Sequence, residues 1–339
     1  MTKSSIDYTR RAVLRAAANA TAALAATGAA PLALAQDVKW PLSKPIRFIV
    51  PFAPGGSSEV VARSVATEIT KQLGGQSVYV ENKPGGAGVI AMQDAAKAAP
   101  DGHTWVLGHV GTLAVNPFML SNQPYDVNRD FTPITMLAKV PNVLVVHPDV
   151  PVRTFKEFVA LAKADPTKLN YSSAGNGSAG HLSMEYLKLT AGFPMTHIPY
   201  RGSGPQMTDL LAGRVQVAMN GLPSISTFLK DGKLRPLAAG SSERIPVLPD
   251  VPTIAESGYP GFETSQWYGV LAPKGTPAPI VNRIREACVT ALGSKAVKDR
   301  FANDSALAVG DTPEQFGAYI VAQQKIWKEI VEKAGIKAD

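Results

Sequence analysis

From residue 45 onward, short runs of apolar, β-branched residues alternate with segments of helical periodicity. In the first third of the chain, runs at residues 46–52, 78–81 and 105–108 are separated by helical patterns at 60–73 and 89–98. A repeated succession of strand and helix predicts βαβ units, in which parallel strands form a sheet that helices cover. This alternation restricts the chain to the α/β class.

A second set of alternating elements begins near residue 142. The length of 339 residues supports a division into two lobes, because one domain usually has about 100–200 residues. The expected helices and strands of this second set lie at residues 142–147, 155–164, 170–173, 181–191, 196–200, 207–212, 215–220 and 234–239.

The last part of the chain follows a segment rich in Pro and Gly. One strand is expected at residues 267–272, and two helices follow it. Thr276, with a proline directly after it, marks the start of the first helix. Thr312 and Gln315 have the spacing of a capping box, which predicts the start of the second helix.

The first 35 residues have the pattern of an export signal. Arg10 and Arg11 precede an Ala-rich stretch, and an A-x-A cleavage pattern ends at Ala35. The arginine pair resembles a twin-arginine signal. We expect residues 1–35 to be removed and the mature protein to be soluble in the periplasm. A membrane anchor is the alternative, although Ala, Thr and Gly form a poor membrane span.

Composition argues against several classes of site. Cys288 is the single cysteine, so neither a disulfide framework nor a thiolate-rich metal site is expected. The five histidines lack the spacing typical of metal ligands, and we expect no metal and no cofactor. Part of the net charge of +7 belongs to the export signal, and the other basic residues are scattered. This distribution does not favour nucleic-acid binding.

Four Gly-rich loops each follow an expected strand and precede an expected helix. They lie at residues 51–59, 82–88, 172–181 and 200–205. All four contain glycines, and all but the second also contain serine. Glycine lets backbone N–H groups approach a bound group closely, and a helix start adds unpaired N–H donors and a positive dipole end. Each loop therefore predicts a seat for a small anion, above all a carboxylate.

Ligands of open α/β sheets bind beyond the carboxyl ends of the strands, so two loops from each lobe are expected to face one another across one cleft. Arg201 is the strong charge among the expected donors. The candidate ligand-binding residues are Phe52, Ala53, Gly55, Gly56, Ser57, Ser58, Gly86, Ala87, Gly88, Ser173, Gly175, Asn176, Gly177, Ser178, His181, Tyr200, Arg201, Gly202 and Ser203.

Two enzymatic interpretations compete with simple binding. Residues 86–91 fit the dinucleotide fingerprint G-x-G-x-x-A, but they follow the second strand of their lobe and lack a suitable acidic residue about 20 positions later. Ser178 lies in N-G-S-A-G, which lacks the first glycine of a nucleophile elbow. His181 is on the same helix start and cannot be assumed to act as its base. We therefore expect no catalytic residue.

Short motifs occur in a fixed order along the chain: PIRFIVPF (45–52), GG (55–56), ENKPGGAG (81–88), AAPDGHT (98–104), GNGSAGH (175–181), PYRG (199–202) and WYGV (267–270). In this order they resemble the extracytoplasmic solute-binding receptors of the tripartite tricarboxylate transporter family, the Bug receptors. The resemblance covers nearly the whole mature chain. It implies a two-lobed periplasmic-binding-protein fold of type II, a Venus flytrap, in which each lobe is a mostly parallel sheet flanked by helices.

The resemblance also implies where the lobes divide. Lobe 1 would comprise residues 37–138 and 259–339, and lobe 2 would comprise residues 139–258. The hinges would lie near Leu137–Val140 and Gly258–Glu263.

Two residues of the first loop affect the expected specificity. Many members of the family have Asp where this chain has Glu59, a position at the helix start that can cap the helix or shape the pocket. Because a longer carboxylate can redirect the pocket, amino-acid ligands are not presumed. Phe52 is expected to form a wall of the pocket.

The implied function is binding without chemistry. A monomeric receptor would capture a small carboxylate between its lobes and deliver it to the membrane permease of a tripartite tricarboxylate-type transporter. A periplasmic sensor that signals a carboxylate to a membrane kinase is the alternative. The sequence leaves open whether the solute is an aromatic acid, a citrate-like acid or an aliphatic diacid.

Overall fold

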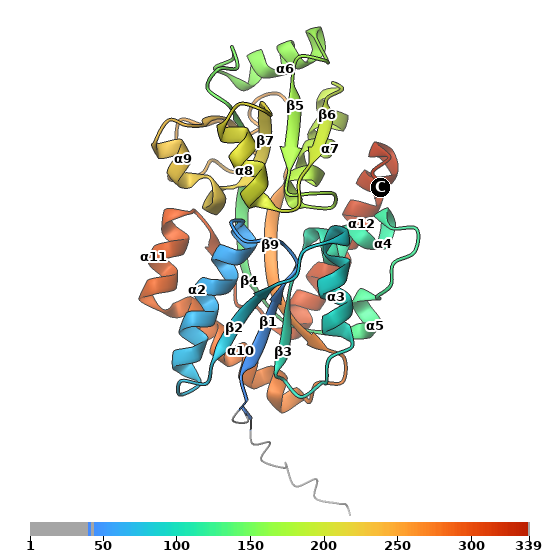
Figure 1. Ribbon diagram of the computed structural model, residues 1–339, viewed down its shortest axis with the longest axis vertical. Coiled ribbons are helices and arrows are strands. Elements are labelled where there is room, and N and C mark those ends of the chain that lie inside the picture. Colours follow the sequence, from blue (N-terminus) through green and yellow to red (C-terminus); the bar gives the residue numbers. More distant parts are fainter. Residues whose placement is uncertain (1–39, 42–43, 338–339) are drawn as a thin grey trace, which may run out of the picture. The chain divides into compact units, whose positions relative to one another are not determined.

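The computed structural model describes residues 40–41 and 44–337 (Figure 1). The expected export signal at residues 1–35 lies outside the described residues. No helix in the described part of the chain is both long enough and apolar enough to cross a membrane.

The first strands form the expected βαβ units. β1 (Ile46–Val50) pairs in parallel with β2 (Val78–Asn82) and with β3 (Thr104–His109). The helices between them are α2 (Ser57–Gln72) and α3 (Val89–Ala96). α2 begins three residues before the predicted start at residue 60, because the serines at its start belong to the first helical turn and are buried.

The long strand β4 (Phe131–Val146) differs from the sequence prediction, which placed a strand only at residues 142–147. Its first part pairs antiparallel with β9 (Ser265–Pro273). Its last five residues pair with β7 (Val217–Gly221), and its last four pair with β8 (Arg235–Ala239). Pro133 and Pro141 lie within β4. They argue against a strand in the sequence, because proline has no backbone N–H to donate to a sheet hydrogen bond. The register shifts near Pro133, and such irregularities are where sheets tolerate proline.

The second group of strands again has parallel pairs. β5 (Asn170–Ser173) pairs in parallel with β6 (Thr196–Pro199) and with β7 (Val217–Gly221), whereas β8 (Arg235–Ala239) runs antiparallel to β4. The strand order is β2-β1-β3-β9-β4-β7-β5-β6, so β4 and β9 connect the two groups (Figure 1). The helices of this group are α6 (Phe155–Ala164), α7 (Ala179–Ala191), α8 (Ser203–Leu211) and α9 (Ser226–Lys230).

The predicted start of the last helix is confirmed. The Thr312 side chain accepts a hydrogen bond from the Gln315 N–H, and the Gln315 side chain accepts one from the Thr312 N–H. This helix is α12 (Pro313–Ala334), and α10 (Ala278–Gly293) is the helix expected after Thr276. Elements that the sequence analysis did not predict are η1 (Gly86–Gly88), the π-helical turn η2 (Gly111–Val115), α4 (Asn116–Met119), α5 (Val127–Asp130), η3 (Leu222–Ser224), α9, α11 (Lys295–Asn303) and β10 (Leu307–Ala308).

Both faces of the sheet are covered, as the apolar strands require. In β1, Ile46, Phe48 and Val50 pack in a core with α2, α10 and α11, whereas Ile49 packs in a second core with α3 and α12. Successive side chains of a strand point to opposite faces, which explains this division. The second strand group also has two cores, one with α6 and α7 and one with α8. The sheet therefore holds the loops at its strand ends on a rigid base.

Candidate functional site

The four Gly-rich loops lie at the carboxyl ends of β1, β2, β5 and β6, as predicted, and they contact one another in pairs. A Cβ built on Gly55 of the first loop would lie 3.4 Å from the Gly204 Cα in the fourth. A Cβ on Gly177 of the third loop would lie 3.2 Å from the Ala87 Cβ in the second. A Cβ on Gly202 of the fourth loop would lie only 2.4 Å from the Ala53 Cβ of the first, so a larger residue at Gly202 would prevent this approach.

A small cavity, the inner pocket, lies where these loops meet. Its volume is about 40 Å³. Its walls are Phe52, Gly56, Ser57, Ser58, His109, Ala174, Ser178, Ala179, Gly180, Ser203, Gln206, Met219, Asn220, Gly221, Ser224, Gln266 and Tyr268. Six of these were predicted from the sequence: Phe52, Gly56, Ser57, Ser58, Ser178 and Ser203.

Three helices begin at the inner pocket. Its walls include Gly56 and the first two residues of α2, Ser178 and the first two residues of α7, and the first residue of α8. The first N–H groups of a helix have no partner within the helix, and they carry its positive dipole end. Among the described residues, those that line the inner pocket include no Lys, Arg, Asp or Glu. Its electrostatic character therefore favours an anion without supplying a formal cation.

The sequence analysis missed the polar side chains that the strands contribute. Gln266 and Tyr268 come from β9, and Asn220 comes from β7. Gln266 donates to the Asn142 Oδ1 at 2.6 Å, and the Tyr268 hydroxyl donates to Gln266. Burial raises the pKa of Tyr268 well above its usual value, so its hydroxyl remains protonated. The available signal was a polar residue within each apolar strand, which usually marks a buried hydrogen-bonding role.

Gln206 of α8 is a further missed residue. Its side-chain amide donates to the Asn220 Oδ1 at 2.9 Å and to the Ser172 carbonyl at 3.2 Å. Gln206 is 1% exposed. This amide therefore fixes the side chain of Asn220 at the wall of the pocket.

A second, larger cavity, the outer cavity, has a volume of about 830 Å³. Phe52 and Ala174 line both cavities, so these two residues lie where the cavities adjoin. Arg201 is exposed and lines the outer cavity, not the inner pocket. The predicted residues that line the outer cavity are Phe52, Ala53, Gly86, Ala87, Gly88, Gly175, Asn176, Tyr200, Arg201 and Gly202.

Four predicted residues, Gly55, Ser173, Gly177 and His181, line neither cavity. Ser173, Gly177 and His181 shape the third loop from within. The His181 Nδ1 accepts a hydrogen bond from the Gly177 N–H at 3.2 Å, and the His181 ring stacks on His197. The Ser173 hydroxyl lies 2.7 Å from the His197 Nε2. Burial lowers the pKa of His197 to about 3, which keeps this imidazole neutral.

Gly55 is held by the side chain of Glu59. The Gly55 N–H donates to the Glu59 Oε2 at 2.7 Å, and the Arg63 Nε donates to the Glu59 Oε1 at 2.6 Å. The Glu59 carboxylate lines neither cavity. Its longer side chain therefore folds back to hold the first loop and does not enter the pocket.

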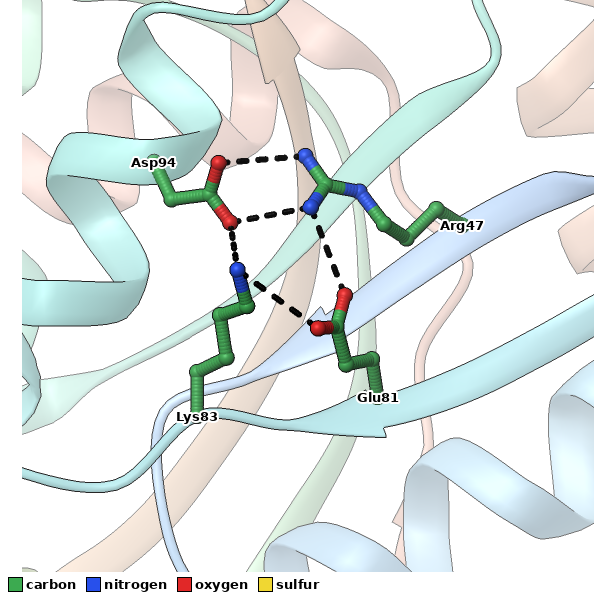
Figure 2. A network of polar contacts seen from close by, with 4 residues as sticks. All are labelled: Arg47, Glu81, Lys83 and Asp94. Carbon is green, nitrogen blue, oxygen red and sulfur yellow. Dashed lines mark hydrogen bonds and ion pairs between the residues drawn. The ribbon is translucent and has the colours of Figure 1, made fainter.

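The second loop is held by a network of four charged side chains (Figure 2). Arg47 of β1 donates to Asp94 of α3 at 2.9 and 3.2 Å and lies 3.3 Å from Glu81. Lys83, at the start of the loop, bonds to the same Asp94. Burial opposes ionisation of Asp94, but the bonds from Lys83 and Arg47 outweigh it and hold the pKa of this carboxyl below its usual value. Both ends of the loop are thereby tied to β1.

Across residues 40–41 and 44–337, no group of three or more His, Cys, Asp or Glu side chains is arranged to hold a metal ion.

Comparisons with known proteins identify relatives of the chain. A model of the tripartite tricarboxylate transporter family receptors matches residues 61–336. The BugT protein of Bordetella pertussis is 39% identical over 296 residues, which cover 87% of this chain and 90% of BugT.

Solved structures show the same fold. Rpa4515 of R. palustris with adipate has a TM-score of 0.84 at 36% identity and covers 88% of this chain and 99% of its own. The periplasmic binding protein BugD has a TM-score of 0.84 at 34% identity, and the match covers 88% of this chain and 100% of BugD. MatC of Rhodopseudomonas palustris with bound malate has a TM-score of 0.82 at 33% identity, and the match covers 86% of this chain and 100% of MatC. The fold is the two-lobed α/β fold of periplasmic binding proteins, as the sequence resemblance implied.

Proposed function

Because the chain belongs to the tripartite tricarboxylate transporter receptor family, we propose that it captures a small carboxylate in the inner pocket and delivers it to the membrane subunits of such a transporter. The observation that carries this proposal is the convergence of three helix N-termini, those of α2, α7 and α8, on a pocket without charged side chains. Helix N-termini are established seats for carboxylates and other anions. Relatives of known structure that hold adipate and malate support the same chemical class.

Capture would require the loops to separate and close again. A volume of about 40 Å³ is well below the roughly 150 Å³ of a protein cavity that binds benzene. A dicarboxylic acid of four to six carbons therefore enters only when the pocket is wider. We propose that lobe 1 (37–138 and 259–339) and lobe 2 (139–258) rotate about β4 and the segment before β9. The binding free energy selects the closed form.

The pocket walls also suggest which acids are excluded. Among the described residues that line either cavity, none is Asp or Glu. The ammonium group of an amino acid would then be buried without a charged partner, which is costly. We propose that the receptor prefers acids without an amine. Malate and aspartate form the matched pair, since they differ only in a hydroxyl and an ammonium group.

The protein is proposed to bind without chemistry. Ser173 and His197 form a close hydroxyl–imidazole pair, but neither residue lines a cavity, so the pair has no access to a solute there. We further propose that the mature chain acts in the periplasm, in keeping with the periplasmic relative BugD. We also propose that it is cleaved near Ala35 and acts as a monomer.

A thermal-shift screen tests the proposal. Residues 36–339 are unfolded and refolded to remove carried-over solute and are then screened against succinate, malate, adipate, citrate, benzoate and aspartate, with glucose as the uncharged control. An acid at about 100 times its Kd adds about 2.7 kcal/mol of stability, which raises Tm by several degrees. We expect at least one acid to raise Tm and glucose to leave it unchanged. A folded protein that responds to none of the acids contradicts the proposal.

A further inference from the structure

His109 is a buried wall of the inner pocket that the sequence patterns did not assign to binding. It is the last residue of β3 and lies opposite Tyr268 of β9 in the sheet register. The side chain is 3% exposed. Its ring stacks on Phe52 with centroids 4.5 Å apart and planes at 12°, and it meets the Tyr268 ring edge-on at 6.4 Å. The imidazole is therefore fixed in place on both sides.

Backbone hydrogen bonds determine which ring nitrogen carries the proton. The His109 Nδ1 accepts from the Gly111 N–H at 2.6 Å and from the Thr112 N–H at 3.2 Å. A nitrogen that accepts hydrogen bonds is unprotonated, so the proton of the neutral ring is on Nε2. Burial lowers the pKa of His109 to about 4, and the ring is therefore neutral at pH 7. The ring thus presents an N–H donor at Nε2, on the side away from Gly111 and Thr112.

This donor has no partner among the described residues. The His109 Nε2 is fully buried and forms no hydrogen bond with any residue that the structure describes. Buried polar groups are nearly always paired, because an unpaired one loses its hydration without compensation. His109 lines the inner pocket, so a solute that enters the widened pocket can supply the missing acceptor.

We infer that the His109 Nε2–H donates a hydrogen bond to a carboxylate oxygen of the bound acid and thereby selects for an acceptor at this point of the inner pocket. The inference rests on the proposed function and adds a specificity-determining side chain to it. The donor is neutral, so it adds no cation to the pocket. It also disfavours an ammonium group at the same place, because two donors would then face each other.

His103 provides a matched comparison within the chain. Its Nε2 is also buried and unpartnered, and its side chain is 4% exposed. His103 packs against Trp40, with ring centroids 6.2 Å apart, and lines neither cavity. An unpartnered imidazole nitrogen alone is therefore not a binding site. His109 differs from His103 because it lines the inner pocket, where α2, α7 and α8 begin.

Two substitutions separate the donor from the structural role of the ring. His109→Asn keeps an acceptor near the Nδ1 position for the Gly111 N–H and removes the donor at Nε2. His109→Gln places an amide N–H near the Nε2 position and removes the Nδ1 acceptor. Both variants lose the ring stack on Phe52, so that loss cancels when they are compared. His103→Asn is the control for removal of a buried imidazole elsewhere.

Affinity is measured by calorimetry at pH 7 with the panel acid that binds the wild type most tightly. We expect the Kd of His109→Asn to rise at least about 10-fold, in line with the loss of a hydrogen bond to a charged group. His109→Gln should bind more tightly than His109→Asn, and His103→Asn should match the wild type. Circular dichroism and Tm establish that each variant is folded.

A spectroscopic measurement on the wild type does not depend on how the variants fold. In protein labelled with ¹⁵N-histidine, saturation with the same acid should move the Hε2 resonance of His109 downfield, while its Nδ1 keeps the shift of an acceptor. An unchanged Hε2 resonance in the saturated protein, or a Kd of His109→Asn within twofold of the wild type, overturns the inference and leaves the proposed function intact. Failure of every acid to bind the wild type overturns both.

Discussion

The position of Phe52 where the two cavities adjoin allows a quantitative prediction. The ring is half-buried, stacks on His109, and lines both the inner pocket and the outer cavity. An aromatic pair of this geometry contributes about 0.5–1.5 kcal/mol beyond its buried area. Burial of a whole Phe side chain contributes about 1.5–3 kcal/mol, and a half-buried one about half of that.

Phe52→Ala should therefore lower the free energy of unfolding by about 2 kcal/mol. Because a bound acid would also bury the exposed half of the ring, the same change should weaken binding by about 1 kcal/mol, which corresponds to a roughly fivefold higher Kd. Phe52→Leu keeps most of the apolar volume and loses the stack, so it should lower the free energy of unfolding by about 1 kcal/mol and raise the Kd less than Phe52→Ala does. In both variants the inner pocket also opens to the outer cavity, so water reaches the bound carboxylate.

Calorimetry with the best-binding acid of the panel measures both constants. Phe118→Ala is the control, since Phe118 is an exposed phenylalanine of α4 that lines neither cavity. Its Kd should equal that of the wild type. If folded Phe52→Ala binds within twofold of the wild type, Phe52 is not a wall of the binding site and the reasoning is refuted.

Three further predictions concern charged and reactive groups. Arg201→Ala should leave the Kd within about twofold, because Arg201 is exposed and does not line the inner pocket; calorimetry checks this. Asp94→Asn should lower the free energy of unfolding by about 1 kcal/mol at pH 7. Because the folded pKa of Asp94 is depressed, urea titrations should show this difference above about pH 4 and its loss as the pH falls further. Native Cys288 should resist iodoacetamide in a mass-spectrometric assay, because burial raises its thiol pKa to about 12.

Much of the fold could be predicted from local sequence patterns. α6 and β5 have the predicted bounds, and the Thr312 capping box forms, because these features depend on neighbouring residues. The first part of β4 was missed because it depends on residues that are distant in the sequence. Its Pro133 and Pro141 argue locally against a strand, and only pairing with the distant β9 stabilises it. The lobe boundaries stay a prediction.

In the candidate site, too, the features that depend on local sequence could be predicted and those that depend on distant segments could not. The loops at strand ends could be located from glycines and helix starts, and six of the predicted residues line the inner pocket. Gln266, Tyr268 and Asn220 could not be assigned, because they lie within strands and meet only when distant segments pair. His109 was considered only as a metal ligand, since its value as a donor depends on the backbone bonds to its Nδ1.

The most direct test of the account is a crystal structure of the protein with the acid that binds most tightly in the screen. The account predicts a chemically unaltered acid in the inner pocket, with a carboxylate oxygen within hydrogen-bond distance of backbone N–H groups at the starts of α2, α7 or α8. An acid bound only in the outer cavity against Arg201, or one that has been converted to a product, would contradict the account.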